Sequence, residues 1–353
     1  MTDLAVTPEM APHQNTAQKP RKRNAFAAVF AFSLGYWRQQ IPRVLWAGGA
    51  IAVATLMDIC IPLFAGKLID AVSAPHSEGA LDNALFALGC IMGLGSIAVT
   101  FRFLAFAGIT QLTLRVMSRL LEDSFWRVQR FSTDWHANTF GGSTVRKITR
   151  GMWALDQLDD TVILALFPAC IVLLGSSLLL AWHWPMMGLL VLVGAITYIA
   201  VAATLSVKFV GPAASLSNQW DTRLGGVLAD SITCNAVVKS FGAETREDGL
   251  LERVVTKWRR RTSRTWMRGT TNGTIQSLML LTLRAAIIGM AIYLWWTGQA
   301  TPGEVAYVLT AYLVIHGYLY DIGSYIRDLQ RSVNDMEDRK STRLNSSHLG
   351  ISR

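Results

Sequence analysis

The chain has 353 residues, of which 51% are hydrophobic and only 16% are charged, and its formal net charge is +9. This composition is typical of an integral membrane protein and argues against a soluble multidomain protein of the same length. The positive charge is concentrated in a few segments beside apolar stretches, where it reports membrane orientation, so we expect a lipid bilayer and no nucleic acid as partner.

The N-terminal part is polar at first and then amphipathic. Residues 1–23 contain too few apolar side chains to bury a core, so we expect a disordered cytosolic tail. Residues 24–42 begin NAFAAVFAFSLGYWRQQ and are too short and too mixed to cross a membrane. They predict an interfacial elbow helix that lies along the inner leaflet.

Six apolar stretches follow, each close to the ~20 residues that cross a hydrocarbon core. They cover about residues 44–64, 84–107, 161–182, 186–207, 275–296 and 305–326. The sequence therefore predicts an all-α membrane protein, with six transmembrane helices inside residues 43–339.

Two connections, about residues 108–160 and 208–274, are much longer than the others and are rich in Arg and Lys. They keep a helical period, so we expect the spans to continue as cytosolic helical extensions of roughly 35–40 Å. Basic loops stay in the cytosol, which places both termini there as well. Trp182 and Trp184, beside a short outer turn, are expected at the opposite interface.

Each extension needs a point where the chain reverses. In the first, residues 138–143 (NTFGGS) should break the helix. In the second, the helical stretch LGGVLADSITCNAVVKSFGAE lies near the middle, at residues 224–244. Its apolar stripe consists of Leu224, Leu228, Ile232, Val238 and Phe241. An exposed apolar stripe far from the spans predicts a docking partner in the cytosol.

With these features the chain resembles the transmembrane domain of ABC exporters, the six-span type of multidrug and lipid exporters. Asp230 followed by VVKSFGAE at 237–244 is similar to the family's second intracellular loop, and WHAN at 135–138 is similar to its first coupling helix. Thr301 and Gly303 resemble the start of the family's sixth span.

The resemblance implies that two coupling helices contact nucleotide-binding domains. The residues that it assigns to these contacts are His136, Ala137, Asn138, Gly142, Ser143, Asp230, Ile232, Asn235, Val238 and Phe241. It also implies a homo- or heterodimer of transmembrane domains in a bacterial inner membrane. Such a dimer exports an amphipathic or hydrophobic substrate by alternating access, driven by ATP and Mg²⁺ in the nucleotide-binding domains.

The sequence contains no GxxxxGK motif followed by Ser or Thr, so we expect no nucleotide site or catalytic residue in this chain itself. We interpret residues 340–353 as a non-native or artefactual tail, and the chain as an exporter truncated before its ATP-hydrolysing domain. A permease subunit with a separately encoded ATPase is the alternative, followed by a six-span channel or membrane enzyme.

Ionisable residues inside the spans are candidates for the substrate cavity, because burying a charge in a membrane is costly. These candidates are Arg284, His316, Arg102 and Asp321. Arginine suits an amphipathic substrate with a phosphate or carboxylate. The alternative is that these residues form salt bridges with one another. For Arg102 and Asp321, which lie at matched depth, we favour this pairing. Asp58 lies in the outer part of its own span.

An acidic group precedes the third span. Asp156, Asp159 and Asp160 are close enough in sequence to suggest a metal site. A solvated acidic end at the start of a helix nevertheless explains them well, and we expect no metal.

Overall fold

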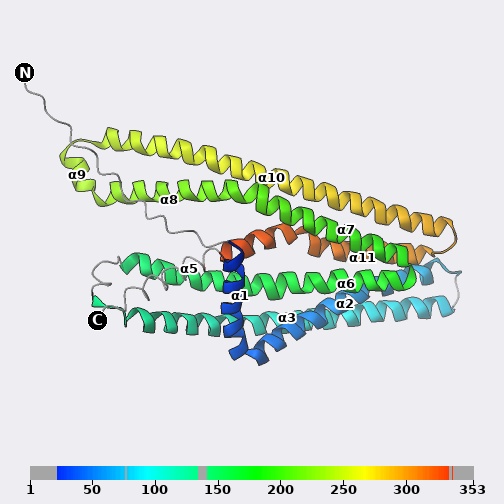
Figure 1. Cartoon of the computed structure of the whole chain (residues 1–353). Helices are drawn as coiled ribbons and strands as arrows, with labels where there is room; N and C mark the ends of the chain where they lie inside the picture. The colour runs from blue at the N-terminus through cyan, green and yellow to red at the C-terminus, as the bar shows by residue number, and fades with distance from the viewer. Residues whose placement is uncertain (1–21, 76–77, 134–140, 334–335, 337–353) are drawn as a thin grey trace, which may run out of the picture.

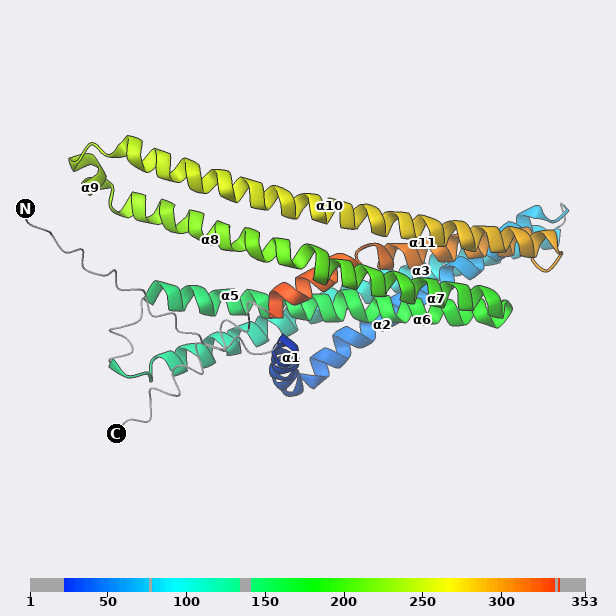
Figure 2. The ribbon, with the colours of Figure 1, turned by 45° about the horizontal axis from the view of Figure 1, so that its top comes forward.

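The computed structural model describes residues 22–75, 78–133, 141–333 and 336, and most of its helices run side by side in one elongated bundle (Figures 1 and 2). The helices are α1 (Lys22–Gln39), α2 (Ile41–Ser73), α3 (Glu78–Val128), α5 (Gly141–Asp160), α6 (Phe167–His183), α7 (Pro185–Thr204), α8 (Gly211–Thr233), α9 (Asn235–Ser240), α10 (Glu244–Trp296) and α11 (Pro302–Tyr320). Two short π-helical segments, η1 (Thr161–Leu166) and η2 (Leu205–Val210), join α5 to α6 and α7 to α8. A last helical segment covers 322–333.

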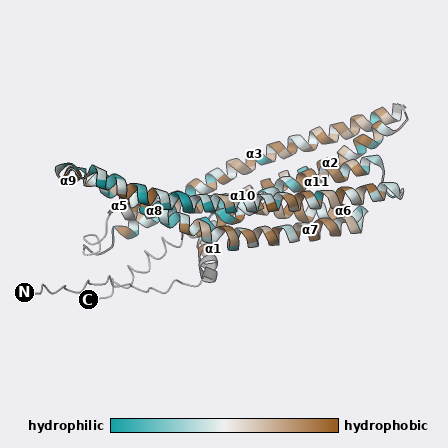
Figure 3. Ribbon diagram, turned by 90° about the horizontal axis from the view of Figure 1, so that it is seen from above, coloured by the Kyte–Doolittle hydropathy of each residue, from teal (hydrophilic) through white to brown (hydrophobic). Residues whose placement is uncertain are grey.

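Six helical segments of the described chain are long and apolar enough to cross a membrane, which confirms the predicted six-span, all-α class. Their bounds are Ile41–Ser73, Gly79–Val128, Ile148–His183, Pro185–Thr233, Glu244–Trp296 and Pro302–Val333. The hydrophobic residues gather toward one end of the bundle, and the other end, around α9, is hydrophilic (Figure 3).

Proline marks the beginning of several helices. It occupies one of the first two positions of α2, α6, α7, α8 and α11. In α2, α7 and α11, which follow a non-helical residue, the missing N–H group has no helical partner to lose. In α6 and α8 that proline, Pro168 or Pro212, is the second residue after η1 or η2. A proline ring clashes with the preceding turn, so the wider π turn lets the chain continue without a break.

Two packed regions hold the bundle together. In the apolar half, α6, α7, α10 and α11 enclose fully buried side chains, including Val172, Met187, Leu280 and Ile315. Toward the hydrophilic end, α3 and α5 enclose a second cluster that includes Leu112, Leu120, Leu155 and Leu158. Lipid tails are as apolar as these side chains, so close packing and polar contacts have to stabilise the part within the membrane.

Two helical extensions project beyond the apolar half, as the two long basic connections predicted. One pairs α3 with α5, and the other pairs α8 with α10 and ends at α9 (Figure 1). The predicted break at 138–143 lies partly outside the described residues. Gly141, Gly142 and Ser143 form the first turn of α5, so this half of the predicted break was wrong.

Helix α1 lies across the other helices near the middle of the molecule (Figure 1), and its place at the inner leaflet stays a prediction. The Trp37 indole Nε1 donates a hydrogen bond of 3.0 Å to Oδ1 of Asp159, which is completely buried. The expectation of a solvated acidic helix end is therefore wrong for Asp159, because α1 covers it. No group of three potential metal ligands occurs in the residues that the structure describes.

The turns at the end of the bundle opposite the extensions are tied to one another. Trp184 is 8% exposed and its Nε1 donates to the carbonyl oxygen of Gln299 at 3.3 Å, whereas Trp182 is 87% exposed. Trp184 therefore bridges two turns, and its expected place at the interface stays a prediction. At the start of α11, Thr301 forms a capping box with Glu304.

Candidate coupling tip and cargo pocket

The second extension ends in a short helix between two bends. Helix α8 stops at Thr233, Cys234 leaves helical geometry, and α9 runs from Asn235 to Ser240. The expected continuous helical stripe is therefore divided between two helices.

The end of α9 is a Schellman turn, which satisfies carbonyl groups that a helix end would leave open. Ala243 N–H donates to the Val238 carbonyl at 3.0 Å, and Gly242 N–H donates to the Lys239 carbonyl at 3.2 Å. Gly242 has a φ of 57°, a left-handed conformation that costs glycine little. The backbone thus reverses at VKSFGAE without strain and enters α10.

Polar contacts fix the tip to the first turn of α10. Ser231 Oγ donates to Glu247 Oε2 at 2.9 Å, and Lys239 Nζ donates to Glu244 Oε1 at 2.8 Å. The hydrogen bond and the negative charge of Glu244 raise the pKa of Lys239 above its ordinary value. Both contacts are local: one joins α8 to α10, and the other joins α9 to α10.

Large apolar side chains of the tip face solvent. The exposed fractions are 73% for Ile232, 57% for Val237 and 80% for Phe241. Asp230 and Asn235 are also exposed, whereas Val238 is half-buried. No side chain of α9 is buried. Such a patch on a projecting, polar extension is typical of a surface that another protein covers.

The other predicted tip is only partly visible. His136, Ala137 and Asn138 lie outside the described residues. The backbone of Gly142 and Ser143 belongs to the first turn of α5. These five assignments stay predictions.

The ionisable residues of the spans are arranged differently from the expected pairing. Arg102 forms a salt bridge with Asp58, between α3 and α2, and not with Asp321. The predicted pair was wrong because Asp58 lies deeper in the bundle than its apolar stretch indicated. Helix α2 continues to Ser73, which places its end about 22 Å beyond Asp58 at the rise of an α-helix. This bridge leaves Asp321 without Arg102.

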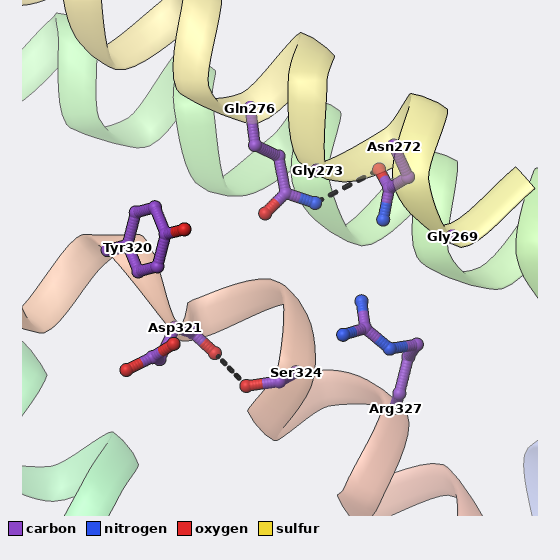
Figure 4. Close-up of a pocket in the computed structure, with 8 residues that line it drawn as sticks. All are labelled: Gly269, Asn272, Gly273, Gln276, Tyr320, Asp321, Ser324 and Arg327. Carbon is purple, nitrogen blue, oxygen red and sulfur yellow. Dashed lines mark hydrogen bonds between the residues drawn. The ribbon is translucent and has the colours of Figure 1, made fainter. Parts of the chain in front are cut away.

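Asp321 instead lines a polar pocket of about 140 Å³, where α11 ends and the 322–333 segment begins. The lining residues are Gly269, Asn272, Gly273, Gln276, Tyr320, Asp321, Ser324 and Arg327. Arg327 and Asn272 point into the same space from opposite walls (Figure 4). The pocket holds a guanidinium, amides and hydroxyl groups together with the Asp321 carboxylate, so it offers hydrogen bonds to a polar group, and Arg327 can pair with an anionic one.

A buried hydrogen-bonded chain lies behind this pocket. Tyr198 OH donates to Gln276 Oε1 at 3.3 Å, and Gln276 Nε2 donates to Asn272 Oδ1 at 3.0 Å. Asn272 Nδ2 donates to Ser206 Oγ at 3.4 Å, and Ser206 Oγ donates to the Gly323 carbonyl at 3.4 Å. The chain therefore joins α7, η2, α10 and the segment after Asp321.

The sequence interpretation missed this network, although one signal was available. Asn272 and Gln276 are four residues apart and therefore share one face of a helix that enters an apolar span. Two amides on one face near a membrane span indicate a polar partner. Ser206 and Gly323 carry no such signal, because their roles depend on the π turn and on the bend after Asp321.

The remaining candidates lie farther along the same helices. His316 stacks on Tyr320 with ring centroids 5.7 Å apart, and its ring lies 5.8 Å from that of Tyr312. Arg284 is exposed, and it forms no salt bridge with any described residue. Arg284 is two helical turns from Gln276, so α10 carries both the pocket and this cation.

Comparisons with known proteins agree with this architecture. A family model described as "ABC transporter transmembrane region" matches residues 44–317. The chain is 23% identical over 314 residues to an ATP-dependent lipid A-core flippase of Chromobacterium violaceum, covering 87% of this chain and 51% of that protein. It is 20% identical over 313 residues to the protein of the same name from Dechloromonas aromatica, covering 88% and 52%.

Among solved structures, a bacterial Atm1-family ABC exporter with ATP bound matches with a TM-score of 0.70 at 20% sequence identity. The match covers 84% of this chain and 53% of that one. At this identity the likeness shows the fold. The chain thus spans about half the length of the curated relatives that it matches.

Proposed function

This chain belongs to the ABC transporter transmembrane family, and we propose that it forms one half of the membrane path of an ATP-driven exporter. Its partners are a second transmembrane domain and two nucleotide-binding domains, which hold ATP and Mg²⁺. It lies in a bacterial inner membrane, with both termini on the side of the extensions. The family match over residues 44–317 carries this proposal.

Helix α9 is the element that receives force from a nucleotide-binding domain. The observation that supports this role is the exposed apolar patch of Ile232, Val237 and Phe241, at the far end of the paired helices α8 and α10. When the ATPase moves, α8 and α10 transmit the motion toward the spans, because packed helices move as rigid bodies. Asp230 and Asn235, exposed beside the patch, supply polar contacts at its rim.

The cargo is an amphipathic molecule with an anionic group, taken from the cytoplasm or the inner leaflet. Support comes from two cations on the path, Arg327 at the pocket and Arg284 farther along α10. Arginine binds phosphate or carboxylate through paired hydrogen bonds. The exposed ring of Tyr320, with the ring of His316 stacked on it, provides an adjoining aromatic surface for the less polar part of the cargo.

The coupling proposal is tested by cross-linking in the assembled transporter, in a background where the native cysteines are replaced by serine. Asn235→Cys should form a disulfide with a cysteine in the cleft of a co-expressed nucleotide-binding domain. Thr297→Cys, beside the outer turn after α10, is the matched control and should remain unlinked. Equal linking at both positions, or none at Asn235 in folded and ATP-hydrolysing protein, would contradict the assignment of α9.

A further inference from the structure

A second hollow lies away from the cargo pocket, between the beginning of α2 and the middle of α3. Its volume is about 520 Å³. The lining residues are Pro42, Arg43, Trp46, Leu104, Ala107, Gly108 and Gln111. We call it the α2–α3 groove. None of the residues assigned to coupling or cargo lines it.

The groove lies where the apolar part of the bundle meets the polar extensions. Pro42 and Arg43 are in the first turn of α2, directly after the transverse helix α1. On α3, Leu104 and Ala107 end the apolar stretch, and Gln111 begins the polar extension. The groove therefore has an apolar wall on the membrane side and polar groups on the side of the extensions.

The polar end is cationic. Arg43 is half-buried and donates one hydrogen bond to the Gln40 side chain, which holds its guanidinium in place. Of the seven described residues that line the groove, Arg43 is the single cation and none is acidic. Beyond Gln111, Arg115 and Arg119 follow at intervals of four residues, so they share its face of α3, and both are exposed.

The apolar end depends on a close approach between two helices. A Cβ atom on Gly108 would lie 2.9 Å from Cδ1 of Trp46 and 3.3 Å from Cβ of Ala47. Glycine at 108 therefore lets the Trp46 ring lie against α3. Trp46 is nevertheless 57% exposed, so one part of its indole forms a wall that faces outward.

We propose that the α2–α3 groove binds an anionic glycerophospholipid from the leaflet beside α1. The phosphate sits at Arg43 and Gln111, and an acyl chain lies along Trp46, Leu104 and Ala107. Arginine and tryptophan at this level suit a lipid, because a guanidinium pairs with phosphate and an indole prefers the interface. A second copy of this chain is a poorer occupant, because the exposed cations Arg115 and Arg119 continue the polar end of the groove and favour an anionic partner.

The test uses the whole chain in phosphatidylcholine vesicles that contain phosphatidylglycerol brominated on its acyl chains, which quenches nearby tryptophan fluorescence. The signal of Trp46 is the difference between the wild-type chain and Trp46→Phe. We expect this signal to be quenched at lower fractions of brominated phosphatidylglycerol than of brominated phosphatidylcholine. Arg43→Gln should weaken the phosphatidylglycerol effect about tenfold, the loss of one charge-assisted hydrogen bond, and Arg43→Lys should keep most of it.

The matched control is Arg253→Gln, in the extension of α10, where the side chain donates to the Gly249 carbonyl. This variant should preserve the lipid preference. Equal quenching by the two lipids, or an unchanged preference in Arg43→Gln, would overturn the proposal. Absence of quenching by either lipid would also overturn it, because the groove would then be covered by protein. The measurement needs no ATPase, so its result is independent of the exporter proposal.

Discussion

The Thr301 hydroxyl donates a hydrogen bond of 2.8 Å to Asp70 Oδ2, across 231 residues of sequence. The other oxygen of the same carboxylate accepts from Gly303 N–H, also at 2.8 Å. One side chain at the outer end of α2 therefore holds the first turn of α11. A Cβ on Gly66 would lie 2.6 Å from the Gly303 carbonyl oxygen, so the two backbones are in close contact beside it.

Asp70→Ala should lower the unfolding free energy by about 1–3 kcal/mol, because Thr301 and the Gly303 amide lose their acceptor. Asp70→Asn should cost less, since its amide oxygen still accepts one bond. Thermal unfolding of the purified chain in detergent measures both. Asp82→Ala, near the exposed start of α3, is the control. An equal loss in the two alanine variants would show that the Asp70 contacts contribute nothing specific.

Gly323→Ala should impair transport, because its Cβ would lie 2.7 Å from the amide of Gln276, at the centre of the buried network. We expect transport to fall while the chain still inserts in the membrane. Gly317→Ala is the matched control, since a Cβ there meets no atom within 4 Å. Vesicle transport by the full exporter is the readout. Similar activities in the two variants would contradict the role of the network.

Breaking the salt bridge between Arg102 and Asp58 should destabilise the chain. Asp58→Asn is expected to cost about 1–3 kcal/mol, less than a fully buried pair, because the Arg102 side chain is 41% exposed. A double-mutant cycle with Arg102→Gln, followed by thermal unfolding, measures the interaction between the two residues. Additive single effects would mean that the pair contributes no coupling energy.

Phe241→Ser should uncouple transport from ATP hydrolysis in the full transporter while leaving stability unchanged. The side chain is 80% exposed, so folding loses little, whereas burial against a nucleotide-binding domain would be lost. We expect transport to fall about tenfold or more, which corresponds to removing a buried phenyl ring from an interface. Phe241→Leu should retain most of the activity. If Phe241→Ser transports normally, α9 does not make this contact.

Arg284→Ala should raise the cargo concentration needed for half-maximal stimulation of ATPase activity by about tenfold, since one charge-assisted hydrogen bond is lost. Arg284→Lys should recover part of the response. Thr282→Ala, exposed on the same helix, is the control. If Arg284→Ala leaves this cargo concentration unchanged, Arg284 does not bind the cargo.

Local sequence determined much of the architecture. Apolar stretches of about span length, and periodic polar segments between them, predicted six membrane helices and two helical extensions. These predictions succeed because every backbone hydrogen bond of a membrane helix lies within its own segment, so the sequence of that segment is enough to indicate the helix. The sequence also placed the second reversal within residues 224–244, and the structure locates its tight turn at Gly242, whose left-handed φ of 57° favours glycine.

Contacts between distant segments were decided only by the tertiary structure. The sequence suggested Arg102 with Asp321, but the lengths and crossing of α2 and α3 bring Arg102 to Asp58. Similarly, α1 covers Asp159, which its acidic neighbours had placed in solvent. A pairing between helices depends on where each helix begins, how far it extends and which face it turns. Those quantities arise from packing the whole bundle, and no single stretch of sequence contains them.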